Sequence, residues 1–197
     1  MEYEKQIQQY LENSGGIITS AYCREYKIPT VYLSRLVKRG ILTKVATGIY
    51  LSKKGNYDEF YFFQYRYKKA IFSYETALYL LGVTDKIPHV MDVTVNYSYK
   101  LNSDIKGFNI HYVKDEILNL GVLEKKTMFG NLVKIYSYER NLCDFIQHKE
   151  EMDSEVYVKL IRSYSDYEGK NIHALYEIAE KMNIVKEVRD IMEVVNE

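Results

Sequence analysis

The chain has 197 residues, of which 47% are hydrophobic and 27% are charged. This composition is typical of a folded protein, and it excludes a wholly disordered chain, a collagen-like chain and a coiled-coil rod. No apolar run approaches the roughly 20 residues that a transmembrane helix needs. The polar start, MEYEKQIQQYLEN, lacks the apolar centre of a signal peptide. We therefore expect a cytoplasmic protein.

The charge is balanced overall but not along the chain. The net charge is zero, yet residues 1–69 carry 12 Lys/Arg and 6 Asp/Glu, while residues 70–197 carry 15 and 21. The first segment is thus at +6 and the second at −6. Such an asymmetry indicates a basic module joined to an acidic one. A basic module attracts phosphate backbones whatever the total charge of the protein.

Cysteine and tyrosine content says less about function. Cys23 and Cys143 each lie on an apolar helical face, so we expect core residues rather than reactive thiols. One disulfide between them is formally possible, but two buried thiols suit a reducing compartment better. Tyrosine accounts for 21 residues. A coding bias towards AT-rich codons explains that number as well as a contact surface does.

The first 55 residues predict a winged helix-turn-helix. Apolar spacing predicts short helices at residues 3–13, 20–26 and 30–39, with Thr19 as the N-cap of the second. After Gly40 the period changes to that of two strands, 41–45 and 49–51, joined by a turn at residues 46–48. Three helices followed by a hairpin place the third helix in the major groove and the hairpin beside it.

The outward face of this predicted third helix is basic and polar. Arginine and lysine neutralise phosphates, an arginine fork can read guanine, and hydroxyl groups add adaptable hydrogen bonds. The alternative is a solvated basic face on a winged helix that binds protein or dimerises. The residues predicted to contact DNA, on the helix and around the wing, are Thr30, Tyr32, Ser34, Arg35, Lys38, Arg39, Lys44, Thr47, Lys53 and Lys54.

The remainder of the chain predicts an α+β domain that closes with helices. Asn56 is expected to cap a helix over residues 58–67, and Ser73 one that Gly82 ends. Strands are expected at 90–99 and 108–113, linked by turn residues Asn102, Ser103 and Asp104. A hairpin of strands 126–129 and 132–136 is expected around Gly130-Asn131. Helical periodicity follows at 139–148, 154–167, 172–182 and 185–194. We expect a DNA-binding domain at residues 1–55 and a second domain at residues 56–197.

No motif for catalysis or metal binding stands out. The histidines, at positions 89, 111, 148 and 173, are far apart in sequence, and no paired C-x-x-C, phosphate loop, nucleophile elbow or kinase motif occurs. Ser73 beside Glu75 is better explained as a helix cap than as an acid–base pair. We predict no cofactor, no metal and no enzyme activity. A catalytic site assembled only by folding stays open.

Three segments resemble the AbiEi-type antitoxins of bacterial abortive-infection (AbiE) toxin–antitoxin systems. The first is the third helix followed by a G-I-L-x-K-V-x-x-G-I-Y wing, here Gly40 to Tyr50. The second is S-Y-E-T-A-L-Y-L-L-G-V, residues 73–83, continuing through D-K-I-P, and the third is Y-E-R-N-L-C-D, residues 138–144. Tyr74 and Leu81 stand where many members carry histidine, and Asn141 replaces a common threonine.

This resemblance implies a transcriptional repressor that binds inverted repeats upstream of its own operon. It also implies neutralisation of a nucleotidyltransferase-like toxin without a stable complex, called type IV, with the carboxy-terminal domain needed for that step. It implies no catalytic residue here. Two alternatives remain: a winged-helix regulator whose second domain senses a ligand or partner, and a protein that enzymatically modifies the toxin.

Overall fold

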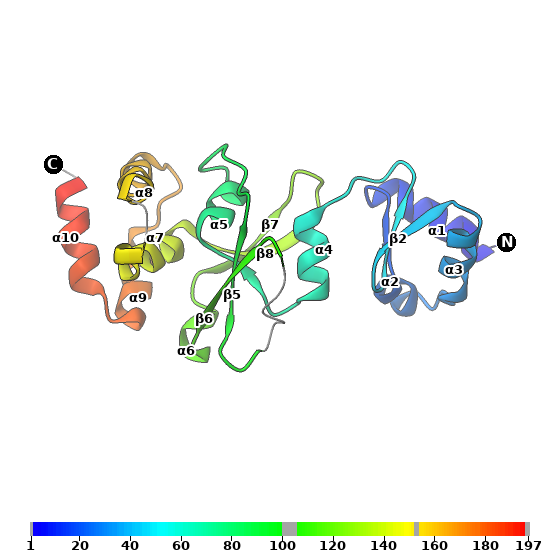
Figure 1. The fold of residues 1–197 in the computed structure, drawn as a ribbon, viewed down its shortest axis with the longest axis horizontal. Coiled ribbons are helices and arrows are strands. Elements are labelled where there is room, and N and C mark those ends of the chain that lie inside the picture. Colours follow the sequence, from blue (N-terminus) through cyan, green and yellow to red (C-terminus); the bar gives the residue numbers. More distant parts are fainter. Residues whose placement is uncertain (1, 100–105, 152–153, 196–197) are drawn as a thin grey trace. The chain divides into compact units, whose positions relative to one another are not determined.

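The computed structural model describes residues 2–99, 106–151 and 154–195. The chain forms two compact units. The amino-terminal unit comprises residues 1–68 together with 126–133, and the carboxy-terminal unit comprises residues 69–125 and 134–197. The fold is α+β, as the sequence predicts, with a winged helix first and a group of helices last (Figure 1). Among the described residues, no helix has the length and apolarity to span a membrane.

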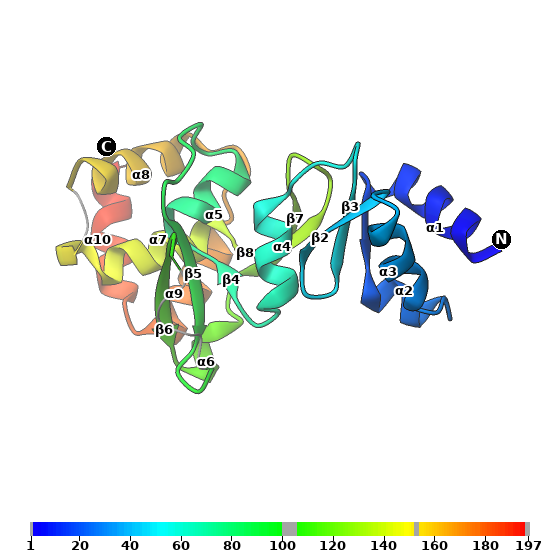
Figure 2. The ribbon, with the colours of Figure 1, turned by 45° about the vertical axis from the view of Figure 1, so that its right-hand side comes forward.

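The amino-terminal unit is a winged helix with one strand more than predicted. Its elements are α1 (Glu2–Asn13), β1 (Ile17–Thr19), α2 (Ser20–Glu25), α3 (Val31–Lys38), β2 (Leu42–Ala46), β3 (Ile49–Ser52) and α4 (Glu59–Arg66). The three strands form an antiparallel sheet in the order β1-β3-β2. Figure 2 shows the hairpin strands β2 and β3 next to α2 and α3.

Local chemistry explains where these helices begin and end. The hydroxyl of Thr19 accepts a hydrogen bond from the backbone N–H of Tyr22, so Thr19 is the predicted N-cap of α2. Ile18 and Cys23, on either side of that cap, are both fully buried. Gly40 has φ of +67°, which ends the segment that contains α3. The core of this unit includes Ile7 and Leu33.

The helix cap predicted at Asn56 is wrong, because Asp58 is the N-cap of α4. One carboxylate oxygen of Asp58 accepts from the backbone N–H of Tyr61 at 3.1 Å. The other accepts from the hydroxyl of Thr127 at 2.6 Å and from the side-chain amide of Asn131 at 2.8 Å. Asp58 is fully buried. It therefore fastens residues 126–133 to the start of α4 within one unit.

The carboxy-terminal unit begins with a mixed sheet. Its strands are β4 (Ile71–Phe72), β5 (Met91–Asn96), β6 (Phe108–Val113), β7 (Val122–Lys126) and β8 (Leu132–Tyr136), in the order β6-β5-β4-β8-β7. Helix α5 (Tyr74–Leu81) follows β4, with Ser73 as its N-cap and Gly82 as its C-cap. The short helix α6 (Asp115–Leu118) follows β6.

Two features of the strand pairing were not predicted. β5 and β6 are neighbours, as predicted (Figure 2). They run parallel, a direction that the sequence did not predict, with Asp92 opposite Asn109. Asn102, Ser103 and Asp104 lie outside the described residues. The first strand of the later hairpin ends at Lys126 instead of beginning there. A five-residue loop, with Gly130 at φ of +85°, therefore joins β7 and β8.

Helices complete this unit and form most of its core. They are α7 (Tyr138–Gln147), the 3-10 turn η1 (Lys149–Glu151), α8 (Ser154–Asp166), α9 (Ile172–Met182) and α10 (Val185–Val195), gathered together in Figure 1. Nearly all of α7 is buried, including Cys143. Burial raises the pKa of the Cys143 thiol to about 12. Cys23 and Cys143 are both free and buried, which confirms their prediction as core residues.

Candidate nucleic-acid interface

Helix α3 presents one apolar face to the core and one polar face to solvent. Leu33 and Leu36 are buried, and Val37 is half-buried. Residues at the intervening positions point outward because a helix turns by 3.6 residues. Thr30, the N-cap, and the side chains of Ser34, Arg35, Lys38 and Arg39 are exposed. The structure thus places these five predicted contact residues on or beside one accessible helix face.

Tyr32 lies at the edge of that face and is half-buried. The guanidinium carbon of Arg35 lies 5.2 Å from the centre of the Tyr32 ring, within the range of a cation–π contact. The Tyr32 ring in turn lies 5.4 Å from that of Tyr3 on α1. Tyr32 therefore supports Arg35 from one side. This contact limits the conformations of the arginine side chain before any ligand binds.

The last basic residue of the helix has a partner within the unit. Arg39 Nη1 donates to Glu4 Oε1 on α1 at 3.0 Å, and the Arg39 side chain remains 55% exposed. Arg39 also lines an open hollow of about 770 Å³ together with Lys53 and Lys54. Glu4 and Glu12 line the same hollow. The structure thus brings together Arg39, Lys53 and Lys54, but it also places carboxylates among them.

The wing residues Lys44 and Thr47 lie elsewhere on the unit. Lys44 is exposed on β2, opposite Tyr50 of β3, and the pairing shifts by one residue between Lys44 and Ala46. Thr47 is exposed in the turn, before Gly48 at φ of +79°. Neither residue lines the hollow that holds Arg39. The ten predicted residues therefore lie in three places: on the exposed face of α3, along the hollow that Arg39 lines, and on the wing.

One further candidate on α3, Val31, was not among the predicted contact residues. Val31 is 49% exposed in the first turn of the helix, three and four residues before Ser34 and Arg35. An apolar side chain exposed on a helix that enters the major groove can contact the methyl group of thymine. The signal was present in the sequence, since Val31 does not fit the apolar stripe of Leu33, Leu36 and Val37.

This unit matches a known family over most of its length. The family is described as a transcriptional regulator, AbiEi antitoxin, and its match covers residues 5–53. That segment runs from α1 through α3 to the end of the wing. The amino-terminal domain matches the AbiEi antitoxin family. The resemblance is confirmed for this segment alone, since the motifs at residues 73–83 and 138–144 lie outside the match.

No curated protein matches the chain. Among solved structures, the RV2827C protein from Mycobacterium tuberculosis is similar, with a TM-score of 0.48 and 10% sequence identity. The alignment covers 98% of this chain and 81% of that one. No group of three or more metal-ligating side chains occurs among the described residues.

Proposed function

We propose that this protein is a DNA-binding transcriptional repressor and antitoxin. One observation carries the proposal: the exposed face of α3 gathers Ser34, Arg35 and Lys38 within the segment that matches the AbiEi family. Arginine and lysine side chains on a helix of this kind supply phosphate contacts and base readout in the major groove. Residues 1–55 act as the DNA-binding domain and residues 56–197 as the antitoxin domain.

The resemblance supplies the finer parts of the proposal. The operator is an inverted repeat upstream of the protein's own operon, and the protein represses that operon. The toxin is nucleotidyltransferase-like, and its neutralisation needs no stable complex. The protein itself is not an enzyme, requires no cofactor and acts in the cytoplasm. The DNA contacts come from the ten residues on α3 and around the wing.

Fluorescence anisotropy on DNA from upstream of the gene tests this function. We expect a strong preference for that DNA over a scrambled duplex, with affinity that falls steeply as salt rises. Removing one cation far from the site, in Lys181→Ala on α9, should leave the affinity unchanged. Equal binding to both duplexes at every salt concentration would overturn the proposal and assign the basic face to solvation.

A second candidate function follows from a cavity in the carboxy-terminal unit. A winged-helix regulator can sense a ligand through its second domain. A cavity of about 480 Å³ lined by Asp92 and His111 falls in the size range of small-molecule sites. Toxin neutralisation in cells distinguishes the two functions. Variants in that cavity that keep DNA binding and neutralisation, but lose a response to ligand, would favour sensing.

A further inference from the structure

One cavity of the carboxy-terminal unit is lined by a histidine and an aspartate that contact each other. It measures about 480 Å³ and lies among α5, α7 and the β5–β6 pair. Asp92 comes from β5, Asn109 and His111 from β6, Tyr74 from the start of α5 and Phe145 from α7. Because Asp92 pairs with Asn109 in the parallel register, the polar side chains stand on one face of the two strands.

Asp92 holds the imidazole of His111 in one orientation. The distance from His111 Nε2 to Asp92 Oδ1 is 2.9 Å, and Asn109 Nδ2 donates to the same oxygen at 3.3 Å. The side chain of Asp92 is only 12% exposed, while that of His111 is 30% exposed. With neutral imidazole, Nε2 carries the proton and donates it to the aspartate. The second ring nitrogen, Nδ1, then presents a lone pair.

Two acceptors at this cavity have no donor among the described residues. All hydrogen bonds of Asp92 use Oδ1 as the side-chain acceptor, which leaves Oδ2 without a partner in that part of the chain. His111 Nδ1 is likewise without one there. Asp92 is a largely buried carboxylate, and a cation in the cavity would supply both charge and donors to its second oxygen.

The aromatic wall of the cavity is fixed in place. The Tyr74 ring lies 4.1 Å from the His111 ring between centroids, and 5.3 Å from the Phe145 ring. Tyr74 has φ of +47°, a left-handed conformation that costs free energy for a residue with a Cβ. Its backbone N–H donates to the side chain of Asn141 at 2.7 Å, which stabilises that conformation. The imidazole therefore has a rigid support.

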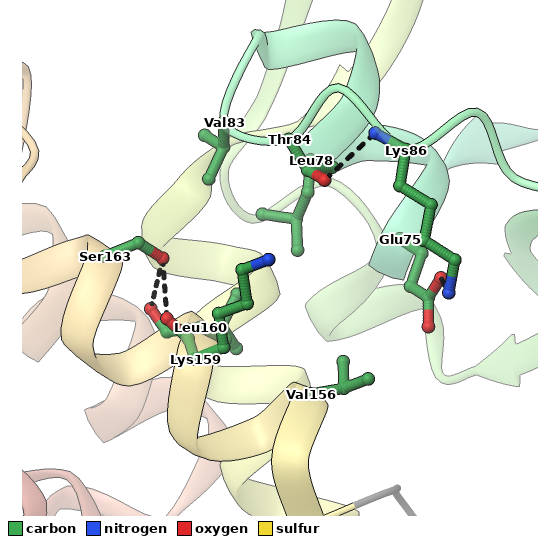
Figure 3. Close-up of a pocket in the computed structure, with 9 residues that line it drawn as sticks. All are labelled: Glu75, Leu78, Val83, Thr84, Lys86, Val156, Lys159, Leu160 and Ser163. Carbon is green, nitrogen blue, oxygen red and sulfur yellow. Dashed lines mark hydrogen bonds and ion pairs between the residues drawn. The ribbon is translucent and has the colours of Figure 1, made fainter.

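The lysine that lines this cavity already has a carboxylate partner. Lys86 Nζ lies 3.6 Å from Glu75 Oε2, and Figure 3 shows the lysine turned towards that carboxylate. The Lys86 side chain is 66% exposed, so it belongs to the rim. Both residues also line a neighbouring cavity of about 330 Å³, whose walls combine apolar and polar side chains. Lys86 therefore pairs with Glu75, whereas Asp92 contacts His111.

We infer that this cavity binds a guanidinium group. A planar guanidinium offers several N–H donors together with a positive charge, and it stacks against aromatic rings more readily than an ammonium does. The carboxylate of Asp92 supplies the charge, and His111 Nδ1 supplies a neutral acceptor beside it. The group belongs either to a small molecule or to an arginine side chain of a protein partner. Nothing in the DNA-binding proposal requires this site.

Calorimetric titration of the full chain tests the inference with three probes. These are agmatine, N-acetyl-arginine methylamide and N-acetyl-citrulline methylamide, the last being a neutral analogue of the second. We expect at least one guanidinium probe to bind about tenfold or more tightly than the citrulline derivative. Binding of agmatine indicates a small-molecule ligand. Binding of the capped arginine alone indicates a side chain from a protein.

The matched variants are Asp92→Asn and Glu124→Gln. The first keeps an acceptor for His111 but removes the charge, so guanidinium affinity should fall about tenfold or more. Glu124 is an exposed carboxylate on β7, and its replacement should change nothing. If Asp92→Asn unfolds, ring NMR signals of His111 in the unaltered protein provide the readout. Equal binding of arginine and citrulline probes, full binding by folded Asp92→Asn, or unmoved His111 signals would overturn the inference.

Discussion

The side chain of Asn141 accepts a hydrogen bond from the backbone N–H of Tyr74, with 2.7 Å between Oδ1 and N. Both residues are buried. The amide nitrogen of Asn141 donates to the carbonyl groups of Tyr136 and Ser137. One side chain thus joins the start of α7 to the left-handed residue that starts α5. The second and third segments of the family resemblance are connected by this bond.

Removing that bond should destabilise the carboxy-terminal unit. Asn141→Ala removes the side-chain oxygen that accepts from the buried N–H of Tyr74, which costs about 1–3 kcal/mol in free energy of unfolding. Asn141→Thr keeps an oxygen that can accept and should lose less. Urea unfolding gives both values. Asn13→Ala is the control, because the amide of exposed Asn13 donates only within α1. Equal losses for Asn141→Ala and Asn141→Thr would contradict this account.

A buried ion pair within α7 supports the same region. Arg140 is fully buried, and its Nε donates to Asp144 at 3.0 Å. Its Nη1 donates to the carbonyl groups of Ile117 and Leu120, beside α6. Nη2 has no hydrogen-bond partner among the described residues, but the guanidinium carbon lies 4.3 Å from the centre of the Tyr136 ring. The arginine therefore ties the end of α6 to α7.

Replacing Arg140 alone should cost far more than replacing the pair. Arg140→Met leaves Asp144 as an unpaired buried carboxylate, with an expected loss of about 3–5 kcal/mol. Burial already raises the pKa of Asp144 while Arg140 lowers it, so the variant should raise that pKa further. The loss should shrink as pH falls and Asp144 takes up a proton. Urea unfolding at several pH values measures it.

The double variant Arg140→Met/Asp144→Leu provides the control for this pair. It removes both charges and keeps apolar volume, so it should recover a large part of the lost stability. Its stability should also lose the pH dependence that Arg140→Met acquires. A double variant as unstable as the sum of the two single ones would show that the ion pair does not act as a unit.

The burial of Tyr138 should make the protein less stable at alkaline pH. Burial raises the pKa of Tyr138 to about 12, against 10.0 for a free tyrosine, although a hydrogen bond with Ser163 opposes the shift. Between pH 10 and about 12 the unfolded chain holds fewer protons at this position than the folded one. The free energy of unfolding should therefore fall as pH rises through that window, by about 2–3 kcal/mol for this residue.

Urea unfolding across that alkaline range measures the fall in stability. Tyr138→Phe keeps the ring and removes the titrating group, so its stability should depend less steeply on pH. It also loses the bond to the Leu160 carbonyl, which lowers its stability uniformly below pH 10. Identical pH slopes for the variant and the unaltered protein would show that Tyr138 does not titrate late.

The sequence predicts elements well where the apolar period is long or the strand is clearly bounded. The helix at residues 172–182 and the strand at 108–113 have the predicted bounds. The short strands β1 and β4 were missed, because two or three residues carry too little periodicity. The cap of α4 was wrong because the choice between Asn56 and Asp58 depends on Thr127 and Asn131, about 70 residues away in sequence.

For the candidate site, too, local features were predictable from the sequence and long-range contacts were not. Helical spacing is sufficient to place Arg35 and Lys38 outward on α3. Local pattern gives no information on the ion pair of Arg39 with Glu4, since their side chains meet across 35 residues. The contact of Asp92 with His111 was equally hidden, because it depends on the parallel register of two strands. Long-range pairing therefore decides which charges remain available.

Two substitutions on α3 should weaken DNA binding in different ways. If Arg35 reads a base, Arg35→Ala should cost about 1–3 kcal/mol and relax the preference for operator DNA. If Lys38 contacts phosphate, Lys38→Ala should weaken binding to all duplexes and lower the salt slope by about 1. Anisotropy on operator and scrambled DNA across a salt series distinguishes the two. Unchanged affinity in both variants would contradict the assignment of this face to DNA.

The ion pair between Glu4 and Arg39 should restrain DNA binding rather than support folding. The Arg39 side chain is 55% exposed and that of Glu4 22%, so the pair lies at the surface and Glu4→Gln should change stability by less than about 1 kcal/mol. The substitution frees Arg39 and removes a negative charge beside Lys53 and Lys54. Affinity for operator DNA should then rise roughly two- to tenfold, with a steeper salt slope. Glu187→Gln on α10 changes the net charge equally and should have no effect.

In an Arg39→Ala background the gain in affinity from Glu4→Gln should fall sharply. A gain that persists in full in that background would show that Arg39 is not the group released.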